Sequence, residues 1–232
     1  MTTDGKRLFV AVELSLATTK KIAEATQRLA HAARTRQLDV AWVPPPNLHV
    51  TLAFLGWAQP EAAEAVRDTL IDVARTQRAF EVEARGTGAF PSEAEARVLW
   101  FGVHDPKGAL AALAGVVGPR MAALGFTIEP RPFVPHVTIG RVLGGAGRAT
   151  QPVAELFMAY RQASFGTSQI RALTLFESRT GSGGSLYTPL HRAPLGTPER
   201  QTRGVHDPLD QSNTEEPTTH GRREARREEG QD

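Results

Sequence analysis

The feature that most constrains the fold of this chain is a short motif that occurs twice. Pro46-Asn47-Leu48-His49-Val50-Thr51-Leu52 has a near-copy at Val134-Pro135-His136-Val137-Thr138-Ile139. Side chains alternate between the two faces of a β-strand. Each motif therefore predicts a strand with one aliphatic, buried face and one face that presents a histidine beside a threonine. Two such strands can bring both polar pairs to a single substrate.

The segments around the two motifs alternate between strand-like and helix-like patterns. Helices are expected from about 18 to 36, from 60 onward, over 109–124 and over 153–162, and the stretch 86–95 is expected to be a turn-rich loop. The expected strands are Lys6–Leu14, His49–Leu55, Phe80–Ala84, Arg97–Val103, Phe126–Glu129, His136–Val142, Ile170–Ser178 and Leu186–Leu190. Both histidine strands take the same place in a similar order of elements. This predicts an α+β fold of two pseudo-symmetric lobes, each with an antiparallel sheet and flanking helices, and an active-site cleft between them.

Length and composition indicate how the chain is divided. A chain of 232 residues is long enough for one large domain, and residues 1–195 are expected to form it from two related halves. Residues 196–232 carry six arginines and nine acidic side chains with few apolar ones, so we expect a disordered tail. The chain has no cysteine, no secretion signal and no apolar run near the roughly 20 residues of a membrane span. These features favour a cytoplasmic protein without a membrane partner, and a monomer is the expected state.

The residue types in the motifs suit chemistry at phosphorus. Histidine titrates near neutral pH, so two histidines in one site can serve as acid and base in one turnover. A threonine hydroxyl can donate a hydrogen bond to a phosphate oxygen. His49, Thr51, His136 and Thr138 together suit an in-line displacement that needs no cofactor. The motifs contain no carboxylate for Mg²⁺ and show no zinc-like ligand spacing, so no metal site is expected.

Four further side chains are candidates for substrate contact. Arg131 and Arg141 flank the second motif, and a guanidinium group matches the geometry of phosphate. Arg141 and Phe54 each follow their histidine by an odd number of residues, which places them on the opposite face of a regular strand. They reach the substrate only if the strand twists, bulges or ends there. Phe54 would then stack on a base and is otherwise a core residue; Tyr187 follows a glycine-rich loop and is a candidate for ligand contact.

Several stretches of the chain, including both motifs, resemble the two-histidine (2H) phosphoesterases, and among them the bacterial and archaeal RNA 2′,3′-cyclic phosphodiesterases, also called 2′-5′ RNA ligases. The similar stretches are Arg7–Ala11, Trp42–Pro44, Asn47–Gly56, Arg131–Arg141, Glu177-Ser178 and Tyr187. The chain departs from the pattern at Ile139-Gly140, where Leu-Ala is more usual. The resemblance implies hydrolysis of an RNA terminal 2′,3′-cyclic phosphate to a 2′-phosphate, with 2′-5′ RNA ligation as an associated reaction. Ends of tRNA fragments are among the RNA partners that it suggests.

The resemblance also implies roles for single residues. His49 would be the proton donor to the 3′ leaving oxygen, and His136 the proton acceptor that activates water. Thr51, Thr138 and Arg141 would bind the phosphate, and Phe54 would pack on the terminal base. Because the two motifs are nearly identical, the assignment of acid and base stays open. Two other functions also stay open: a 2H hydrolase of a small nucleotide-derived cyclic phosphate, and a protein that binds RNA ends without turnover.

Overall fold

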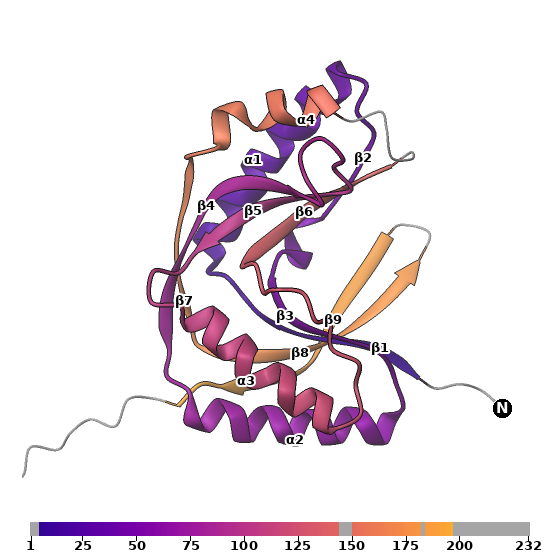
Figure 1. Cartoon of the computed structure of the whole chain (residues 1–232), viewed down its shortest axis with the longest axis vertical. Coiled ribbons are helices and arrows are strands. Elements are labelled where there is room, and N and C mark those ends of the chain that lie inside the picture. The colour runs from indigo at the N-terminus through magenta and orange to yellow at the C-terminus, as the bar shows by residue number, and fades with distance from the viewer. Residues whose placement is uncertain (1–4, 144–149, 182–183, 197–232) are drawn as a thin grey trace, which may run out of the picture. The chain divides into compact units, whose positions relative to one another are not determined.

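The structure of the chain is a computed structural model that describes residues 5–143, 150–181 and 184–196 (Figure 1). The tail predicted to be disordered, residues 196–232, lies outside the described residues except for Gly196. Within the described ranges, no helix has the length and apolar character needed to cross a membrane.

The described strands form two antiparallel sheets, as the sequence predicts. The first sheet has the order β3-β1-β8-β9 and the second has the order β2-β6-β5-β4-β7. The first sheet consists of β1 (Lys6–Val12), β3 (Val50–Ala58), β8 (Ala172–Gly181) and β9 (Gly184–Pro194). The second consists of β2 (Val40–Trp42), β4 (Phe80–Phe90), β5 (Val98–His104), β6 (His136–Val142) and β7 (Ser164–Ile170). The two histidine motifs thus belong to different sheets, β3 in the first and β6 in the second.

The two sheets have corresponding strand orders, and two helices join the lobes because each follows a strand of one sheet but packs on the other sheet. The order β3-β1-β8-β9 corresponds to β6-β5-β4-β7, with a histidine strand at the same position in each. Helix α1 (Leu16–Thr35) follows β1 of the first sheet but packs on β7 and β2 of the second. Helix α3 (Ala109–Ala123) follows β5 of the second sheet but packs on β3 of the first, and α2 (Pro60–Thr76) packs on β8 and β9. Each lobe therefore combines segments from both halves of the sequence.

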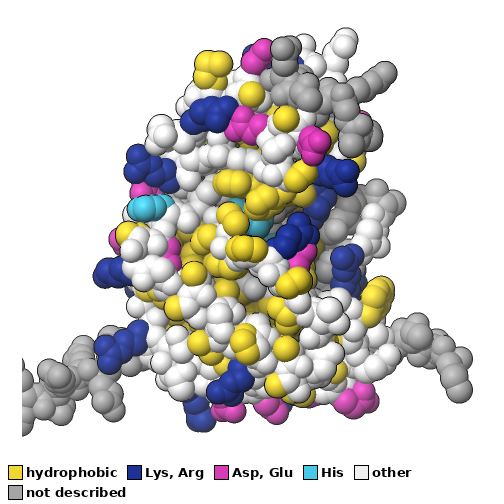
Figure 2. Space-filling model, in the orientation of Figure 1, with side chains coloured by type: hydrophobic (Ala, Val, Ile, Leu, Met, Phe, Trp, Pro, Cys, Tyr) yellow, Lys and Arg dark blue, Asp and Glu magenta, His cyan; other side chains and the backbone are white. Residues whose placement is uncertain are grey.

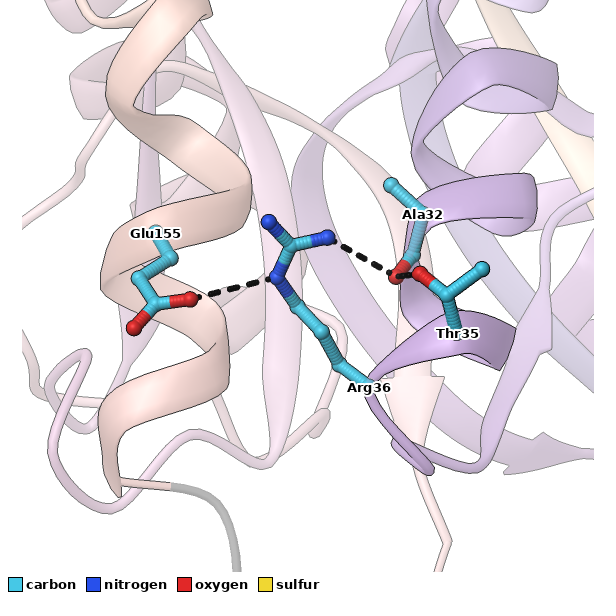
Figure 3. Close-up of polar contacts among 4 residues, drawn as sticks. All are labelled: Ala32, Thr35, Arg36 and Glu155. Carbon is cyan, nitrogen blue, oxygen red and sulfur yellow. Dashed lines mark hydrogen bonds and ion pairs between the residues drawn. The ribbon is translucent and has the colours of Figure 1, made fainter.

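Helix α1 shows how local sequence positions a long element. It begins where Ser15 Oγ accepts a hydrogen bond from the Thr18 amide at 3.2 Å, and Ile22, Ala25, Leu29 and Ala33 form its buried stripe. At its other end, Arg36 Nε contacts Glu155 Oε2 of α4 (Thr150–Phe157) at 3.3 Å (Figure 3). This ion pair is exposed and contributes at most about 1 kcal/mol, so it orients the two helix ends more than it stabilises them.

Four expectations about strands are wrong. The predicted loop 86–95 is strand up to Phe90, because Gly88 leaves the space that the Trp100 ring of β5 fills: a Cβ at residue 88 would lie 2.1 Å from that ring. Residues 126–129 form no strand, whereas β2 (Val40–Trp42) and β7 (Ser164–Ile170) are strands that the sequence pattern does not predict. These three errors concern segments with weak alternation, whose strand or loop state depends on the partner strand rather than on their own pattern. Two short 3₁₀ helices, η1 (Pro45–Asn47) and η2 (Met158–Tyr160), complete the described elements.

Candidate active site

The two histidine motifs meet where the two sheets meet. Strands β3 and β6 are in contact, and Figure 1 shows them close together between the two lobes. The positive charge of a protonated His136 is one of the causes that lower the pKa of His49, so the two imidazoles lie within electrostatic reach of each other. Figure 2 shows hydrophobic side chains gathered around a histidine near the centre of the visible face, with Lys or Arg side chains beside them.

Both imidazoles are oriented in the same way by the backbone. The Nδ1 atom of His49 lies 2.7 Å from the Asn47 carbonyl oxygen, and Nδ1 of His136 lies 2.7 Å from the Val134 carbonyl oxygen. A carbonyl oxygen only accepts hydrogen bonds, so Nδ1 is the donor in both rings. The Nε2 atom of each neutral ring is therefore unprotonated and carries a lone pair. In each motif Nε2 is the nitrogen that can exchange a proton with a substrate.

His49 lies against a group of aromatic rings contributed by three other strands of the first sheet. Its ring stacks on Phe9 of β1 at a centroid distance of 4.8 Å, and Phe176 of β8 lies at 5.9 Å. Tyr187 of β9 meets the same ring edge-on at 5.3 Å. The Nε2 atom lies 3.0 Å from Thr51 Oγ1, whose hydroxyl donates to the neutral ring. Burial, opposed by the bond to Asn47, lowers the pKa of His49 to about 4.

His136 has a different and more open setting. Phe90 of β4 meets its ring edge-on at a centroid distance of 4.9 Å, and Trp100 of β5 lies at 5.9 Å. Within the described residues it makes no hydrogen bond to Thr138, the counterpart of Thr51. Burial lowers the pKa of His136 too, while the bond to the Val134 carbonyl raises it. At neutral pH both imidazoles are thus mainly uncharged in the unliganded chain.

A β-bulge in each histidine strand determines which face of the strand carries Arg141 or Phe54. On β6, Thr138 pairs with Trp100 but Gly140 pairs with the next residue, Leu99, so Ile139 is an extra residue in the strand. Ile139 and Gly140 are both buried, and Arg141 after them is exposed. The alternation is thereby reversed, and Arg141 shares the face of His136 and Thr138.

The first motif contains a β-bulge at the same position relative to its histidine. On β3, Thr51 pairs with Ala11 and Ala53 with the adjacent Val10, which makes Leu52 the extra residue. Phe54 is consequently 58% exposed and lies 6.2 Å, centroid to centroid, from Phe9, the ring that stacks on His49. Both strands thus bulge before the residue in question, and the side chains of Phe54 and Arg141 lie on the histidine faces of their strands.

The other two candidates differ in their surroundings. Tyr187 lies beside His49, packed edge-on against Phe9 at 5.0 Å. Arg131 is exposed and forms an ion pair with Glu129, two residues before it in the same segment. Its guanidinium group would have to exchange that carboxylate for a phosphate.

Several residues of the site could not be found from the sequence. Phe9 and Phe176 lie in apolar runs in which nothing distinguishes the residue that faces His49 from its core neighbours. Asn47 is buried, and its Nδ2 donates to the Ser185 carbonyl of β9 at 2.6 Å while its own carbonyl holds His49. It fastens the start of the histidine strand to the other edge of the sheet. Its position two residues before a histidine can be read from the sequence, but that position alone does not predict either hydrogen bond.

The arrangement provides two proton-exchanging nitrogens, two hydroxyls and the guanidinium group of Arg141 within one region of the surface. Among the described residues, no group of three or more His, Cys, Asp or Glu is placed to hold a metal ion. The side chains present can take up a small anion and move protons on two sides of it.

Comparison with known proteins assigns the fold and the family. The chain matches the family model described as LigT like Phosphoesterase over residues 16–100 and 102–187, one histidine motif in each. The RNA 2′,3′-cyclic phosphodiesterase of Archaeoglobus fulgidus is 32% identical over 184 residues, which is 79% of this chain and 97% of that protein. The enzyme of the same name from Escherichia coli K12 is 30% identical over 191 residues, 82% of this chain and 96% of that protein.

Solved structures show the same similarity. The crystal structure of Escherichia coli LigT in complex with 3′-AMP superimposes with a TM-score of 0.63 at 28% identity, and covers 83% of this chain and 99% of LigT. A Thermus thermophilus protein superimposes with a TM-score of 0.67 at 26% identity and the same coverage.

Proposed function

The chain belongs to the LigT-like phosphoesterase family, and its similarity to the relatives of that name over most of its length makes it an RNA 2′,3′-cyclic phosphodiesterase; we propose that His49 and His136 carry out the reaction without a metal ion. The observation that carries this proposal is the matched pair of imidazoles, each with Nδ1 bound to a backbone carbonyl and Nε2 unprotonated in the neutral ring. Such a pair can act on opposite sides of one phosphorus atom.

The proposed reaction balances as a single displacement. His136 Nε2 takes a proton from water as the water oxygen bonds to phosphorus. The bond from phosphorus to the 3′ oxygen breaks, and that oxygen receives the proton held on His49 Nε2. The products are a 2′-phosphate and a free 3′-hydroxyl, and a proton passes back between the histidines through solvent. Thr51, Thr138 and Arg141 would hold the phosphate oxygens, and Phe54, Tyr187 and Arg131 would contact the rest of the terminal nucleotide.

The low pKa of His49 requires a source for its proton. In the unliganded chain a pKa of about 4 leaves this ring uncharged at pH 7. A cyclic phosphate diester brings a negative charge beside Nε2, and an opposite charge at such a distance favours the protonated form. His49 thus takes up its proton as the substrate binds.

The proposed partner is an RNA end with a 2′,3′-cyclic phosphate, of the kind that cleaved tRNA fragments carry, and 2′-5′ ligation is the same chemistry with a ribose hydroxyl in place of water. Both histidines come from one chain, which supports action as a monomer. The absence of cysteine from the sequence supports a cytoplasmic location.

The test uses an RNA oligomer and a mononucleotide, both with a 2′,3′-cyclic phosphate, in the presence of EDTA. We expect a product with a 2′-phosphate, and a loss of turnover by roughly 10²–10⁴-fold in His49→Ala and in His136→Ala, the range of acid–base catalysis. His31→Ala is the matched control, since His31 is exposed on α1.

Three results would contradict parts of this proposal. Turnover abolished by EDTA would refute the metal-independent mechanism. Unchanged turnover in both histidine variants would refute the assignment of the site. Binding of the oligomer without any product would identify a protein that only binds RNA ends.

A further inference from the structure

The outward face of the first sheet continues past the histidine site to the end of β3. Phe9 pairs with Phe54 across β1 and β3, and two residues earlier on β1 Arg7 pairs with Trp57. Directly paired residues point to the same side of a sheet, so Trp57 and Arg7 extend the face that carries His49 and Phe54. A second irregularity in β3, at Leu55 and Gly56, keeps Trp57 on this face.

Trp57 is largely exposed to solvent and lies close to the start of β1. Its side chain is 75% exposed, more than that of Phe54 beside it. A Cβ added to Gly5 would lie 3.5 Å from Trp57 Cε3, so one edge of the indole lies close to the residue that precedes β1. A single exposed apolar residue needs no explanation, but here two exposed aromatic rings follow one another outward from the histidine site.

The charge beside Trp57 is positive and uncompensated among the described residues. Arg7 is exposed and forms no ion pair with any of them. On the neighbouring strand β8, the acidic residue Glu177 pairs with Leu8, which points to the core side of the sheet. Glu177 is held there by Lys6 and Arg179. The Arg7 guanidinium is thus available to an external anion.

We propose that Trp57 and Arg7 form a subsite for the nucleotide that precedes the cyclic phosphate in an RNA chain. The base of that nucleotide stacks on Trp57, and the phosphodiester that links it to the terminal nucleoside pairs with Arg7. Because of the second irregularity in β3, Trp57 lies two strand positions from Phe54, as Arg7 does from Phe9, which is roughly 7 Å along the strand and a span that the next nucleotide of an unpaired strand can cover. Stacking on an aromatic ring accepts any base, so the subsite selects for length rather than for sequence. This inference rests on the proposed function and extends its substrate from a terminal nucleotide to an oligomer.

The experiment compares a 2′,3′-cyclic mononucleotide with a dinucleotide that ends in the same cyclic nucleoside. In Trp57→Ala we expect kcat/KM for the dinucleotide to fall about tenfold, the weight of one stacked base, while the value for the mononucleotide changes less than about twofold. Trp57→Phe should retain most of the activity on the dinucleotide. In Arg7→Gln the loss should again be confined to the dinucleotide, and the slope of log kcat/KM against log salt should decrease by about one. Met158→Ala, which removes an exposed apolar side chain of η2, is the control.

The outcomes separate this subsite from the proposed function. Equal losses on both substrates, or no loss on the dinucleotide, would overturn the subsite while the phosphodiesterase activity stands. If the unaltered chain turned over neither substrate, the proposed function would fail. A fluorescence titration with the dinucleotide 2′-phosphate then still decides the inference. Quenching in the unaltered chain that Trp57→Phe abolishes supports it, and equal quenching in both overturns it.

Discussion

The two His-Val-Thr motifs have nearly the same sequence and the same backbone, but they stand in different surroundings. Each has an Nδ1 bond of 2.7 Å to a carbonyl two residues earlier and a bulge before the residue five positions after the histidine. His49, however, stacks on Phe9 and bonds to Thr51, whereas His136 touches Phe90 edge-on and makes no such bond within the described residues. The motif sets which nitrogen is reactive, and the neighbouring strands set how readily it is protonated.

The largest expected difference between the two motifs concerns which histidine is the proton donor and which is the proton acceptor. A substrate with sulfur in place of the bridging 3′ oxygen has a leaving group that needs little protonation. We therefore expect His49→Ala to recover most of its roughly 10²–10⁴-fold loss on the sulfur substrate, while His136→Ala recovers little. Single-turnover rates of both variants on both substrates are the measurement.

The opposite pattern, with recovery in His136→Ala alone, would exchange the two roles. That exchange of roles would fit the unprotonated state of His49 in the unliganded chain, because a base must start without its proton. The same low pKa would, however, make His49 a weak proton acceptor.

The second effect is on stability as a function of pH. The pKa of His49 is about 4 in the fold and 6.5 as an unperturbed group, so the unfolded chain binds more protons between these values. The free energy of unfolding should be at its full value above about pH 6.5 and fall as the pH is lowered toward 4, by at most about 3 kcal/mol from this group. Urea unfolding at a series of pH values measures it.

The variants sharpen this contrast between the motifs. His49→Ala should flatten the pH dependence more than His136→Ala. An equal effect of the two motif variants would show that the aromatic stack around His49 does not set its pKa.

A third, smaller effect concerns the residues that the two bulges turn outward. Arg141→Gln should lower kcat/KM by about 10–100-fold for every substrate, because a charge-assisted hydrogen bond to phosphate is worth roughly 1.5–3 kcal/mol. Phe54→Ala should lower it by about tenfold, and more for purine than for pyrimidine ends, because it removes a stacking surface. Steady-state kinetics with each of the common terminal bases distinguish the two. A loss in Arg141→Gln that varied with the base would argue against phosphate as its partner.

A fourth effect, on stability alone, concerns the second residue of each bulge, which is Ala53 in the first motif and Gly140 in the second. A Cβ at residue 140 would lie 2.7 Å from Val40 Cγ1 and 3.1 Å from the Trp42 ring, so β2 must shift to admit it. Gly140→Ala should therefore destabilise the fold by about 1–3 kcal/mol, as overpacking does. The midpoint of urea unfolding reports the change, and Ala53→Gly is the matched reverse substitution. An unchanged midpoint would mean that β2 moves freely.

That same contact lies at a position where the sequence departs from the pattern that it resembles. Gly140 stands where the family pattern more often has alanine, and the sequence alone offers no reason for the difference. In the fold β2 is paired with β6, with Trp42 directly opposite Gly140. The short strand Val40–Trp42 thus limits the space for a side chain at residue 140 of β6.

Much of the site could be predicted from the sequence because its signals are local. The alternation in Leu48-His49-Val50-Thr51 places the histidine and threonine on one face, and the repeat at His136 supplies the partner that acid–base catalysis needs. The start of α2 at Pro60, where a proline suits the first helical turn, also depends only on neighbouring residues.

Only the tertiary structure decided what depends on contacts between distant segments. Both bulges arise from pairing with another strand, so the faces of Phe54 and Arg141 were undetermined in the sequence. The exchange of α1 and α3 between the sheets, the ring of Phe9 beneath His49 and the Gly88–Trp100 contact are further examples. Nearly identical motifs thereby obtain unequal pKa values, since a pKa follows from burial and neighbouring groups, which the fold supplies and the motif does not contain.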